Sequence, residues 1–383
     1  MKHGKVITGG GVTSPLGFKA GAVYVGIKSH KSYKPDVAVL LSDTPAACAA
    51  LFTTNRFPAA PVVLGREIVK KGYIRGLLIN SGNANAGTGS AGLLAARQVT
   101  AFAEETLGLN AGEILVSSTG VIGEALPVEK MKKAVKEITP RLSREAGSEA
   151  AWAIMTTDKH RKEAAYELAL SGGTVRVGVM AKGSGMIHPN MATVLCFITT
   201  DAVMEPDFMR AMLGEACEES FHALTVDGDT STNDSLIMLA SGASGVALEN
   251  EEDRVHMRTL IGHILGDMAK RIAADGEGAE KRITVRVKGL KDKEDARRIA
   301  RGVAASNSVK AALGHGRLSE ALILSAAGAV ESEADFDKVE CYLDREGEEV
   351  LAYLDFHAGD CEAQAFGCDL TGEYIRLNGD YRT

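Results

Sequence analysis

A hydroxyl residue stands where a glycine-rich segment meets an apolar run in the middle of the chain. The segment 181–192 reads AKGSGMIHPNMA, and its glycines and Pro189 allow tight backbone conformations. The run 193–200, TVLCFITT, has the β-branched and apolar composition of a buried strand. If the bond between Ala192 and Thr193 were cut, Thr193 would carry a hydroxyl and a free α-amine. That amine could serve as general base for the hydroxyl, as in N-terminal nucleophiles.

The same junction has a purely structural interpretation. Threonine is common in strands, so Thr193 also fits a strand-opening residue beside a loop. Cys196 is a second potential nucleophile, but a thiol inside an apolar strand is typical of an inert core cysteine. The residue types by themselves leave both interpretations of Thr193 open.

A second segment with features suited to acyl transfer is 117–123, SSTGVIG. A strand end followed by Thr119 and Gly120 offers a hydroxyl and an unobstructed backbone N–H, which are suitable donors for an oxyanion hole. An ordinary strand-to-turn junction has the same pattern, and it is the simpler interpretation of these residues taken by themselves.

Three loops carry side chains that could bind the charged ends of a small substrate. A helix-like run ends in MTTD, which offers the hydroxyls of Thr156 and Thr157. Lys182 stands between two small residues just before the junction, where it could bind a carboxylate. Glu277 stands between two glycines, which let the backbone approach a ligand closely. Each of these residues also has an interpretation without a ligand. The two threonines could cap a helix end, Lys182 could be a solvated surface lysine, and Glu277 could belong to an ordinary charged loop.

We expect no metal site. The segment 227–238 begins D-x-D-x-S like a calcium loop, but Thr232 replaces the glycine at its sixth position and Met238 the glutamate at its twelfth. The six cysteines are scattered without a C-x-x-C pair, so we expect buried thiols and neither a disulfide framework nor a zinc site.

The composition is that of a globular protein with room for two or three domains. The chain has 383 residues, of which 45% are hydrophobic and 24% charged, and its net charge is -7. The negative balance argues against nucleic acid as a partner. We find no signal peptide and no run of about 18 apolar residues, so we expect no membrane association and a cytoplasmic location.

Hydrophobic periodicity predicts alternating strands and helices that position these loops, with a domain boundary near residue 280. The expected strands are a short strand at the start of 5–30, then 37–41, 47–52, 77–80, 114–118, a hairpin of 164–170 and 174–180, 193–200, 282–287, 338–343 and 350–356. The expected helices are 91–107, 128–142, 147–154, 205–221, 251–274 and 292–305, with 306–313 continuing the last after a kink.

The central run KGSGMIHPNMATVLCFITTDA resembles the signature of the ornithine acetyltransferase family. Its members cleave themselves at the Ala–Thr bond of MAT and use the new terminal threonine as nucleophile. Further similar segments are TTNRFPAAPV, NSGNANAGTG, STGVIG, MTTD, DGDTSTND, DGEGA and the closing CDLT…Y…N…Y-x-T. The resemblance therefore covers nearly the whole chain.

This resemblance implies an α/β (α+β) fold of stacked β-sheets flanked by helices. It implies cleavage between Ala192 and Thr193 into an α chain, 1–192, and a β chain, 193–383, with a small C-terminal domain from about 281 to 383. Family members usually assemble these chains into α2β2 heterotetramers. The loop of DGDTSTND is expected to be a hydrogen-bonded turn near the active site.

The resemblance also assigns roles residue by residue. Thr119 and Gly120 form the oxyanion hole. The substrate-binding residues are Thr156, with Thr157 as the alternative, Lys182, Thr193, Glu277, Asn378 and Thr383. The sequence departs from the family after residue 313, where Gly314–Arg317 replaces a longer loop containing Asn-Trp-Gly-Arg; this departure bears on a pocket wall or a subunit contact.

The implied activity moves an acetyl group from N2-acetylornithine to glutamate through an acetyl-threonine intermediate, without a metal or organic cofactor. Some members also take acetyl-CoA as donor, and no sequence feature decides whether this chain does. Two alternatives differ in class. A self-processing amidase or aminopeptidase would use water as acceptor, and a non-catalytic binding protein would leave the chain uncut.

Overall fold

The computed structural model describes residues 4–28, 34–188 and 194–379. Its helices are α1 (Ala60–Ile68), α2 (Gly89–Leu107), α3 (Val128–Ile138), α4 (Gly147–Ala153), α5 (Pro206–Glu218), α6 (Glu251–Ala274), α7 (Lys293–Ala305), α8 (Asn307–Gly314), α9 (Glu320–Gly328) and α10 (Gly372–Gly379). Its strands are β1 (Lys5–Val6), β2 (Phe18–Val23), β3 (Val37–Phe52), β4 (Tyr73–Asn83), β5 (Ile114–Val121), β6 (Lys162–Leu170), β7 (Gly173–Lys182), β8 (Leu195–Thr200), β9 (Ser235–Ala240), β10 (Arg282–Leu290), β11 (Glu340–Glu346), β12 (Glu349–Asp355) and β13 (Cys361–Cys368).

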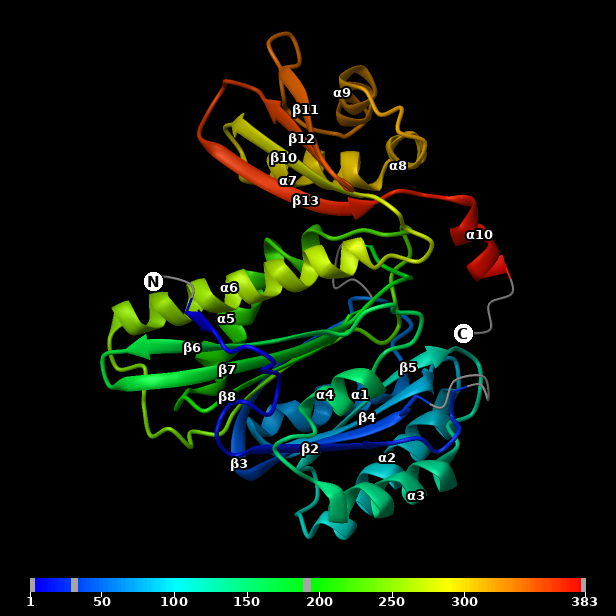
Figure 1. Ribbon diagram of the computed structural model, residues 1–383, viewed down its shortest axis with the longest axis vertical. Coiled ribbons are helices and arrows are strands. Elements are labelled where there is room, and N and C mark those ends of the chain that lie inside the picture. Colours follow the sequence, from blue (N-terminus) through cyan, green and yellow to red (C-terminus); the bar gives the residue numbers. More distant parts are fainter. Residues whose placement is uncertain (1–3, 29–33, 189–193, 380–383) are drawn as a thin grey trace.

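Nine strands form one hydrogen-bonded sheet that folds into two stacked layers. The strand order is β1-β6-β7-β8-β9-β3-β4-β5, and β2 also pairs with β3. The long strand β3 connects the layers, because its first part pairs with β2 and β4 and its last part, from Ala47 to Phe52, with β9. Figure 1 shows β6 to β8 above the layer of β2 and β4, with α5 and α6 over the upper layer and α2 and α3 beneath the lower one.

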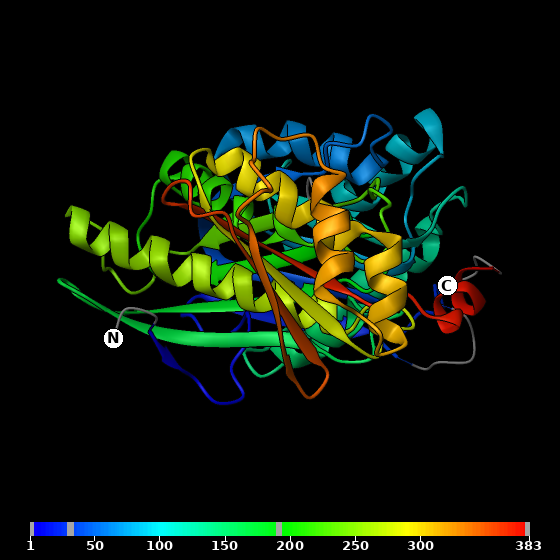
Figure 2. The same ribbon diagram turned by 90° about the horizontal axis from the view of Figure 1, so that it is seen from above.

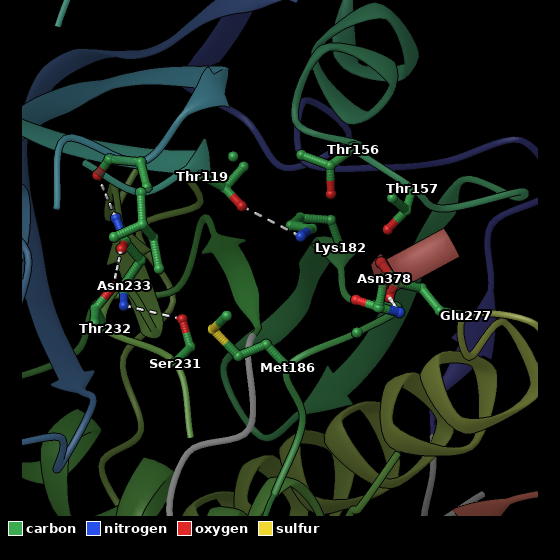
Figure 3. Close-up of a pocket in the computed structure, with 14 residues that line it drawn as sticks. Thr119, Thr156, Thr157, Lys182, Met186, Ser231, Thr232, Asn233, Glu277 and Asn378 are labelled. Atoms are coloured by element: carbon green, nitrogen blue, oxygen red, sulfur yellow. Dashed lines mark hydrogen bonds between the residues drawn. The ribbon is translucent and has the colours of Figure 1, made fainter. Parts of the chain in front are cut away.

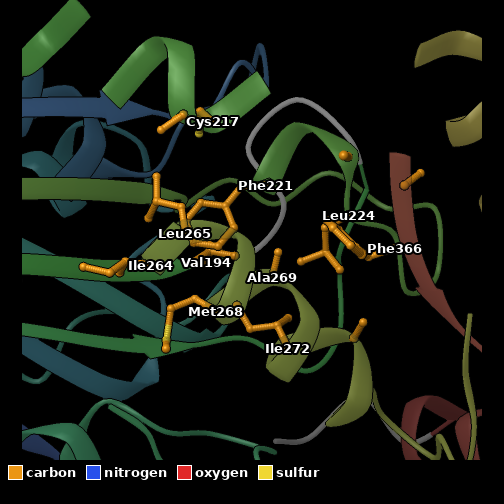
Figure 4. Close-up of a cluster of buried hydrophobic side chains, with 14 of the residues drawn as sticks. Val194, Cys217, Phe221, Leu224, Ile264, Leu265, Met268, Ala269, Ile272 and Phe366 are labelled. Atoms are coloured by element: carbon orange, nitrogen blue, oxygen red, sulfur yellow. The ribbon is translucent and has the colours of Figure 1, made fainter. Parts of the chain in front are cut away.

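Strand β8 is buried on both faces, which explains its unbroken apolar sequence. Cys196 and Ile198 face a core that also contains residues of α5 and α6, whereas Leu195 and Phe197 face a second core shared with β3 and β4. In Figure 4, Val194 lies beside Phe221 and the apolar face of α6. The start of β8 is therefore held firmly in the core.

The C-terminal part forms a separate four-stranded sheet that begins at Arg282. Its strand order is β11-β12-β10-β13, and α7 packs on β10 and β13. Figure 2 shows these strands crossing over α6. After β13 the chain returns to the main sheet, where α10 lies near the end of β5 in Figure 1.

Most predicted elements are present, with corrections that have local causes. The two strands predicted over 37–52 are one strand, β3, with an irregular register between Leu41 and Ala46. The helix predicted to Leu142 ends at Ile138, where Pro140 allows only a short 3₁₀ turn. The segment predicted as a kinked continuation of α7 is the separate helix α8, because Ser306 leaves the helical conformation and caps α8.

Six elements were not predicted: α1, α9, α10, β2, β9 and β13. Helix α9 and strand β9 are short and apolar, and periodicity does not distinguish a strand from a helix in such runs. The strand predicted over 193–200 begins at Leu195, and residues 189–193 lie outside the described part of the chain.

Candidate active site

A hollow lies where the ends of β5 and β7 meet the loops before β9 and after α6. Its volume is about 550 Å³, counting the part open to solvent. The lining residues are Ala84, Thr119, Gly120, Ile122, Thr156, Thr157, Lys182, Gly185, Met186, Ser231, Thr232, Asn233, Glu277 and Asn378. Figure 3 shows hydroxyl, ammonium, amide and carboxylate groups of these residues around one space. Its mixed polar lining suits a small polar molecule.

The predicted oxyanion donors stand at the end of β5. Gly120 has a φ of +130°, and a Cβ atom there would lie 2.3 Å from the carbonyl carbon of Gly82. Glycine is therefore required at this position. Thr119 is buried beside it, and its Oγ1 atom accepts a hydrogen bond from the Nζ atom of Lys182 at 3.3 Å. Because the hydroxyl accepts from an ammonium group, its own hydrogen remains available to donate into the hollow.

Lys182 ends β7 and is buried. Burial lowers the pKa of Lys182 from its usual value, while the carboxylates of Asp158, Glu277 and Asp234 oppose that shift. In Figure 3 its ammonium lies between Thr119 and Thr156. A buried ammonium beside a hollow can bind a carboxylate strongly, because little water screens the pair.

The MTTD turn forms another side of the hollow. Both Thr156 and Thr157 line it, so the geometry leaves the choice between them open. Asp158 is turned away from the hollow and holds the turn, since its carboxylate accepts from the backbone N–H of Thr156 at 3.1 Å. Although burial by itself would raise the pKa of Asp158, the ammonium groups of Lys182 and Lys162 lower it to about 2.

Glu277 and Asn378 meet at the opposite side. The Nδ2 atom of Asn378, on α10, donates to Oε2 of Glu277 at 2.7 Å. A Cβ atom on Gly185 would lie 2.3 Å from the same Oε2 atom, so the glycine leaves space for the carboxylate. The Glu277 carboxylate and the Asn378 side-chain amide therefore lie together although 101 positions separate them in sequence. The carboxylate could bind an ammonium group of a substrate.

The loop before β9 supplies residues that the sequence assigned no role. Ser231, Thr232 and Asn233 line the hollow, which agrees with the expectation that this loop is a hydrogen-bonded turn near the site. The Nδ2 atom of Asn233 donates to the carbonyl oxygens of Ala84 at 2.7 Å and Ser118 at 2.9 Å. These bonds join the two sheet layers at the site. In the sequence, these residues could have been recognised by the high density of hydroxyl and amide side chains directly before β9.

The structure therefore brings together six of the predicted site residues: Thr119, Gly120, Thr156, Lys182, Glu277 and Asn378. Ala192, Thr193 and Thr383 lie outside the described residues, so their placement and the cut at 192/193 stay predictions. The departing loop Gly314–Arg317 is not among the lining residues; the Nζ atom of Lys281 donates to the carbonyl oxygens of Leu313 and Gly314 there.

Among residues 4–28, 34–188 and 194–379, no group of three or more His, Cys, Asp or Glu side chains is placed to hold a metal ion. Within the same ranges, no helix is long and apolar enough to cross a membrane.

The arrangement places the hydroxyl of Thr119, the ammonium of Lys182 and the carboxylate of Glu277 around one hollow. The ArgJ family model matches residues 19–351. The chain belongs to the ArgJ family. The expected resemblance is confirmed, as is the prediction that the chain is an enzyme, an acyltransferase of arginine biosynthesis.

Curated relatives of the ArgJ family align along nearly their whole length. The arginine biosynthesis bifunctional protein ArgJ of Symbiobacterium thermophilum is 44% identical, with 98% of this chain and 99% of that protein covered. ArgJ of Dehalococcoides mccartyi is 42% identical, with 99% and 98% covered. The crystal structure of ArgJ from Bacillus halodurans is 37% identical with a TM-score of 0.46, and the match covers 49% of this chain and 97% of that one. The two stacked layers of the nine-stranded sheet, with helices on their outer faces (Figure 1), confirm the expected fold.

Proposed function

We propose that this ArgJ chain transfers an acetyl group from N2-acetylornithine to glutamate through an acetyl ester on Thr193. The observation that carries the proposal is the hydrogen bond between Lys182 and Thr119 at the edge of the hollow. It leaves the Thr119 hydroxyl free to donate beside the Gly120 N–H, as acyl transfer requires. The family assignment and the curated name of the relatives support the same reaction class.

In the first half-reaction, the Thr193 hydroxyl attacks the acetyl carbon of N2-acetylornithine and its own α-amine takes the proton. The tetrahedral oxyanion receives hydrogen bonds from the Thr119 hydroxyl and the Gly120 N–H. The carbon–nitrogen bond then breaks, the α-amine returns its proton to the departing nitrogen, and ornithine leaves. An acetyl ester remains on Thr193.

In the second half-reaction, the amine of glutamate attacks the ester carbon. The same donors hold the oxyanion while the α-amine of Thr193 takes a proton from the attacking nitrogen. The carbon–oxygen bond to Thr193 then breaks, the α-amine passes that proton to the Thr193 oxygen, and N-acetylglutamate leaves. Lys182 binds a substrate carboxylate, and Glu277 with Asn378 binds the ammonium group of the ornithine side chain. Fixing both ends of the amino acid places its acetyl group against the nucleophile, which lowers the entropic part of the barrier.

The proposal extends to the form of the enzyme. We infer autocatalytic cleavage between Ala192 and Thr193, α and β chains that assemble as α2β2, and a cytoplasmic location. Because Val194 is in the core, the two chains would stay associated after the cut. The reaction needs no cofactor, and acetyl-CoA is the further donor to be tested.

The direct test follows the acetyl group. The purified protein is incubated with N2-acetylornithine, first without and then with glutamate, and analysed by mass spectrometry of the protein and of the small molecules. The expected result is an acetylated Thr193 peptide that loses its acetyl group to glutamate. Release of free acetate at the same rate with and without glutamate would instead indicate a hydrolase, and an unmodified protein would refute the proposal.

A further inference from the structure

Three buried charged residues form an ion cluster behind the wall of the hollow. The Nζ atom of Lys162 on β6 lies 2.8 Å from Oδ1 of Asp158 and 2.5 Å from Oδ2 of Asp275. All three side chains are almost fully enclosed, with exposed fractions of 4% or less. None of the three is among the residues that line the hollow. The reaction just proposed gives them no role.

The first arm of the cluster, Asp158, holds two parts of the wall. Its carboxylate accepts from the backbone N–H groups of Thr156 at 3.1 Å and Gly183 at 2.9 Å. Gly183 directly follows Lys182. One carboxylate therefore fixes the hydroxyl-bearing turn relative to the end of β7.

The second arm, Asp275, directly follows α6 and connects the segment after the MTTD turn to the loop that carries Glu277. Its carboxylate accepts from the N–H groups of Lys159 at 3.1 Å and His160 at 3.3 Å. Its carbonyl oxygen accepts from the Ser184 hydroxyl at 2.6 Å, and the Ser184 carbonyl accepts from the N–H of Glu277 at 2.9 Å. A continuous series of hydrogen bonds thus runs from Lys162 to the loop that carries Glu277.

Stability by itself is a weak reason for such a cluster. Desolvating three charges is unfavourable, and well-packed apolar side chains often stabilise a core equally well. Ionised groups do, however, fix distance and direction more narrowly than apolar contacts, because each hydrogen bond has a preferred geometry. The cluster connects the MTTD turn, the end of β7 and the loop that carries Glu277. These three segments must keep fixed distances from one another if one substrate is to contact all of them.

We propose that Lys162 is a positioning residue for amino-acid binding: through Asp158 and Asp275 it sets the spacing between Lys182 and Glu277. This inference rests on the proposed function, in which these two residues bind the two ends of the substrate. It adds a residue that touches neither substrate nor nucleophile but determines how well both ends are held.

The cluster also sets the charge around Lys182. The titratable groups that face Lys182 are Asp158, Glu277 and Asp234, whose ionised forms favour its protonated form, and Lys162 and Lys28, which oppose it. Removing the charge of Asp158 should therefore lower the pH at which Lys182 loses its proton. Removing the charge of Lys162 should raise that pH.

The test compares Lys162→Met with a matched variant, Lys310→Met. Lys310 is also 2% exposed, but it donates to the carbonyl of Cys368 in the C-terminal sheet. The readouts are the Kd of ornithine by calorimetry, kcat and KM for acetyl transfer, and the masses of the processed chains. We expect Lys162→Met to weaken ornithine binding and raise KM by on the order of 10- to 100-fold, with a smaller change in kcat, whereas Lys310→Met changes neither.

A neutral triple variant covers the case in which Lys162→Met does not fold, since it leaves two carboxylates unpaired. It combines Lys162→Met with Asp158→Asn and Asp275→Asn, which removes all three charges. A folded triple variant with weakened ornithine binding supports the inference. The inference would be overturned if the ornithine Kd and the KM of a folded variant stayed within two-fold of the wild type. It would also be overturned if neither Lys162→Met nor the triple variant gave folded protein.

The pH profile separates positioning from general damage. Asp158→Asn should move the alkaline limb of ornithine binding to lower pH, and Lys162→Met should move it to higher pH, whereas a merely loosened fold would shift both in one direction or not at all. If the wild type binds ornithine but transfers no acetyl group, the proposed function fails and not this inference. If it transfers acetyl groups and the variants bind ornithine normally, only the inference fails.

Discussion

The ammonium of Lys182 donates a hydrogen bond to the hydroxyl of Thr119 across 63 positions of sequence. The pair joins the end of β7 to the end of β5, one in each layer of the main sheet. It also links the two tasks of the site, because the group proposed to bind a substrate carboxylate orients the group proposed to hold the oxyanion.

Replacing Thr119 by alanine should therefore affect turnover more than binding. Loss of one oxyanion donor typically lowers kcat by about 10²–10³-fold, and we expect a KM within a few-fold of the wild type. Steady-state kinetics with N2-acetylornithine and glutamate provide the measurement. The control is Thr100→Ala, which removes an equally buried hydroxyl that donates to Ala96 within α2. Equal kcat values for Thr119→Ala and the wild type would exclude the assigned role.

Gly185→Ala should disrupt the amine-binding side of the hollow. The added methyl group would lie 2.3 Å from Oε2 of Glu277, so the carboxylate must move away from the position in which it accepts from Asn378. We expect ornithine binding, measured by calorimetry, to weaken by at least ten-fold. Gly262→Ala is the matched control, because no atom lies within 4 Å of its added methyl group, and alanine should stabilise α6 by roughly 1 kcal/mol. Normal ornithine affinity in Gly185→Ala would contradict the assignment of Glu277.

Asp234 should make the fold less stable as the pH rises. Burial raises the pKa of this carboxyl well above its usual value, and the Val194 N–H and nearby hydroxyls offset only part of the shift. The folded state therefore binds the proton more tightly than the unfolded state, whose pKa is about 3.9. Stability is greatest below that pH and falls toward the folded-state pKa, by about 1.4 kcal/mol for each unit between the two values.

Asp234→Asn removes this titration. Chemical unfolding should find the variant more stable than the wild type at pH 8 and nearly equal to it at pH 4. The exposed Asp207, which forms a surface pair with Arg210, provides the control substitution Asp207→Asn, for which no such difference is expected. The free energy of unfolding of the wild type is thus compared with that of Asp234→Asn at each pH. The same difference between the two proteins at pH 4 and pH 8 would refute the prediction.

Local patterns were sufficient to predict many elements. Helix α6 has the predicted bounds, because its apolar residues recur with helical spacing and the Asn250 side chain caps its start by accepting from the N–H of Asp253. The β6–β7 hairpin follows from two alternating runs around Ser171, Gly172 and Gly173. These features depend on residues close together in sequence.

The connections within the site could not be predicted in this way. The bond from Lys162 to Asp275 spans 113 positions, and Asn233 contacts Ala84 across 149. Such contacts depend on how the two sheet layers stack, and β9, which carries Asn233 into place, was itself missed. The predicted residues of the hollow were found through resemblance to family motifs, whereas its other lining residues and the residues that hold the site in position became visible only in the structure.

The central claim is that Thr193 becomes the first residue of a separate chain and acts as nucleophile. The most direct test is the intact mass of the purified protein under denaturing conditions, measured beside Thr193→Ala. We predict two chains for the wild type, one ending at Ala192 and one beginning at Thr193, and a single full-length chain for the variant. A single uncut wild-type chain, or cleavage of Thr193→Ala at the same bond, would contradict the account.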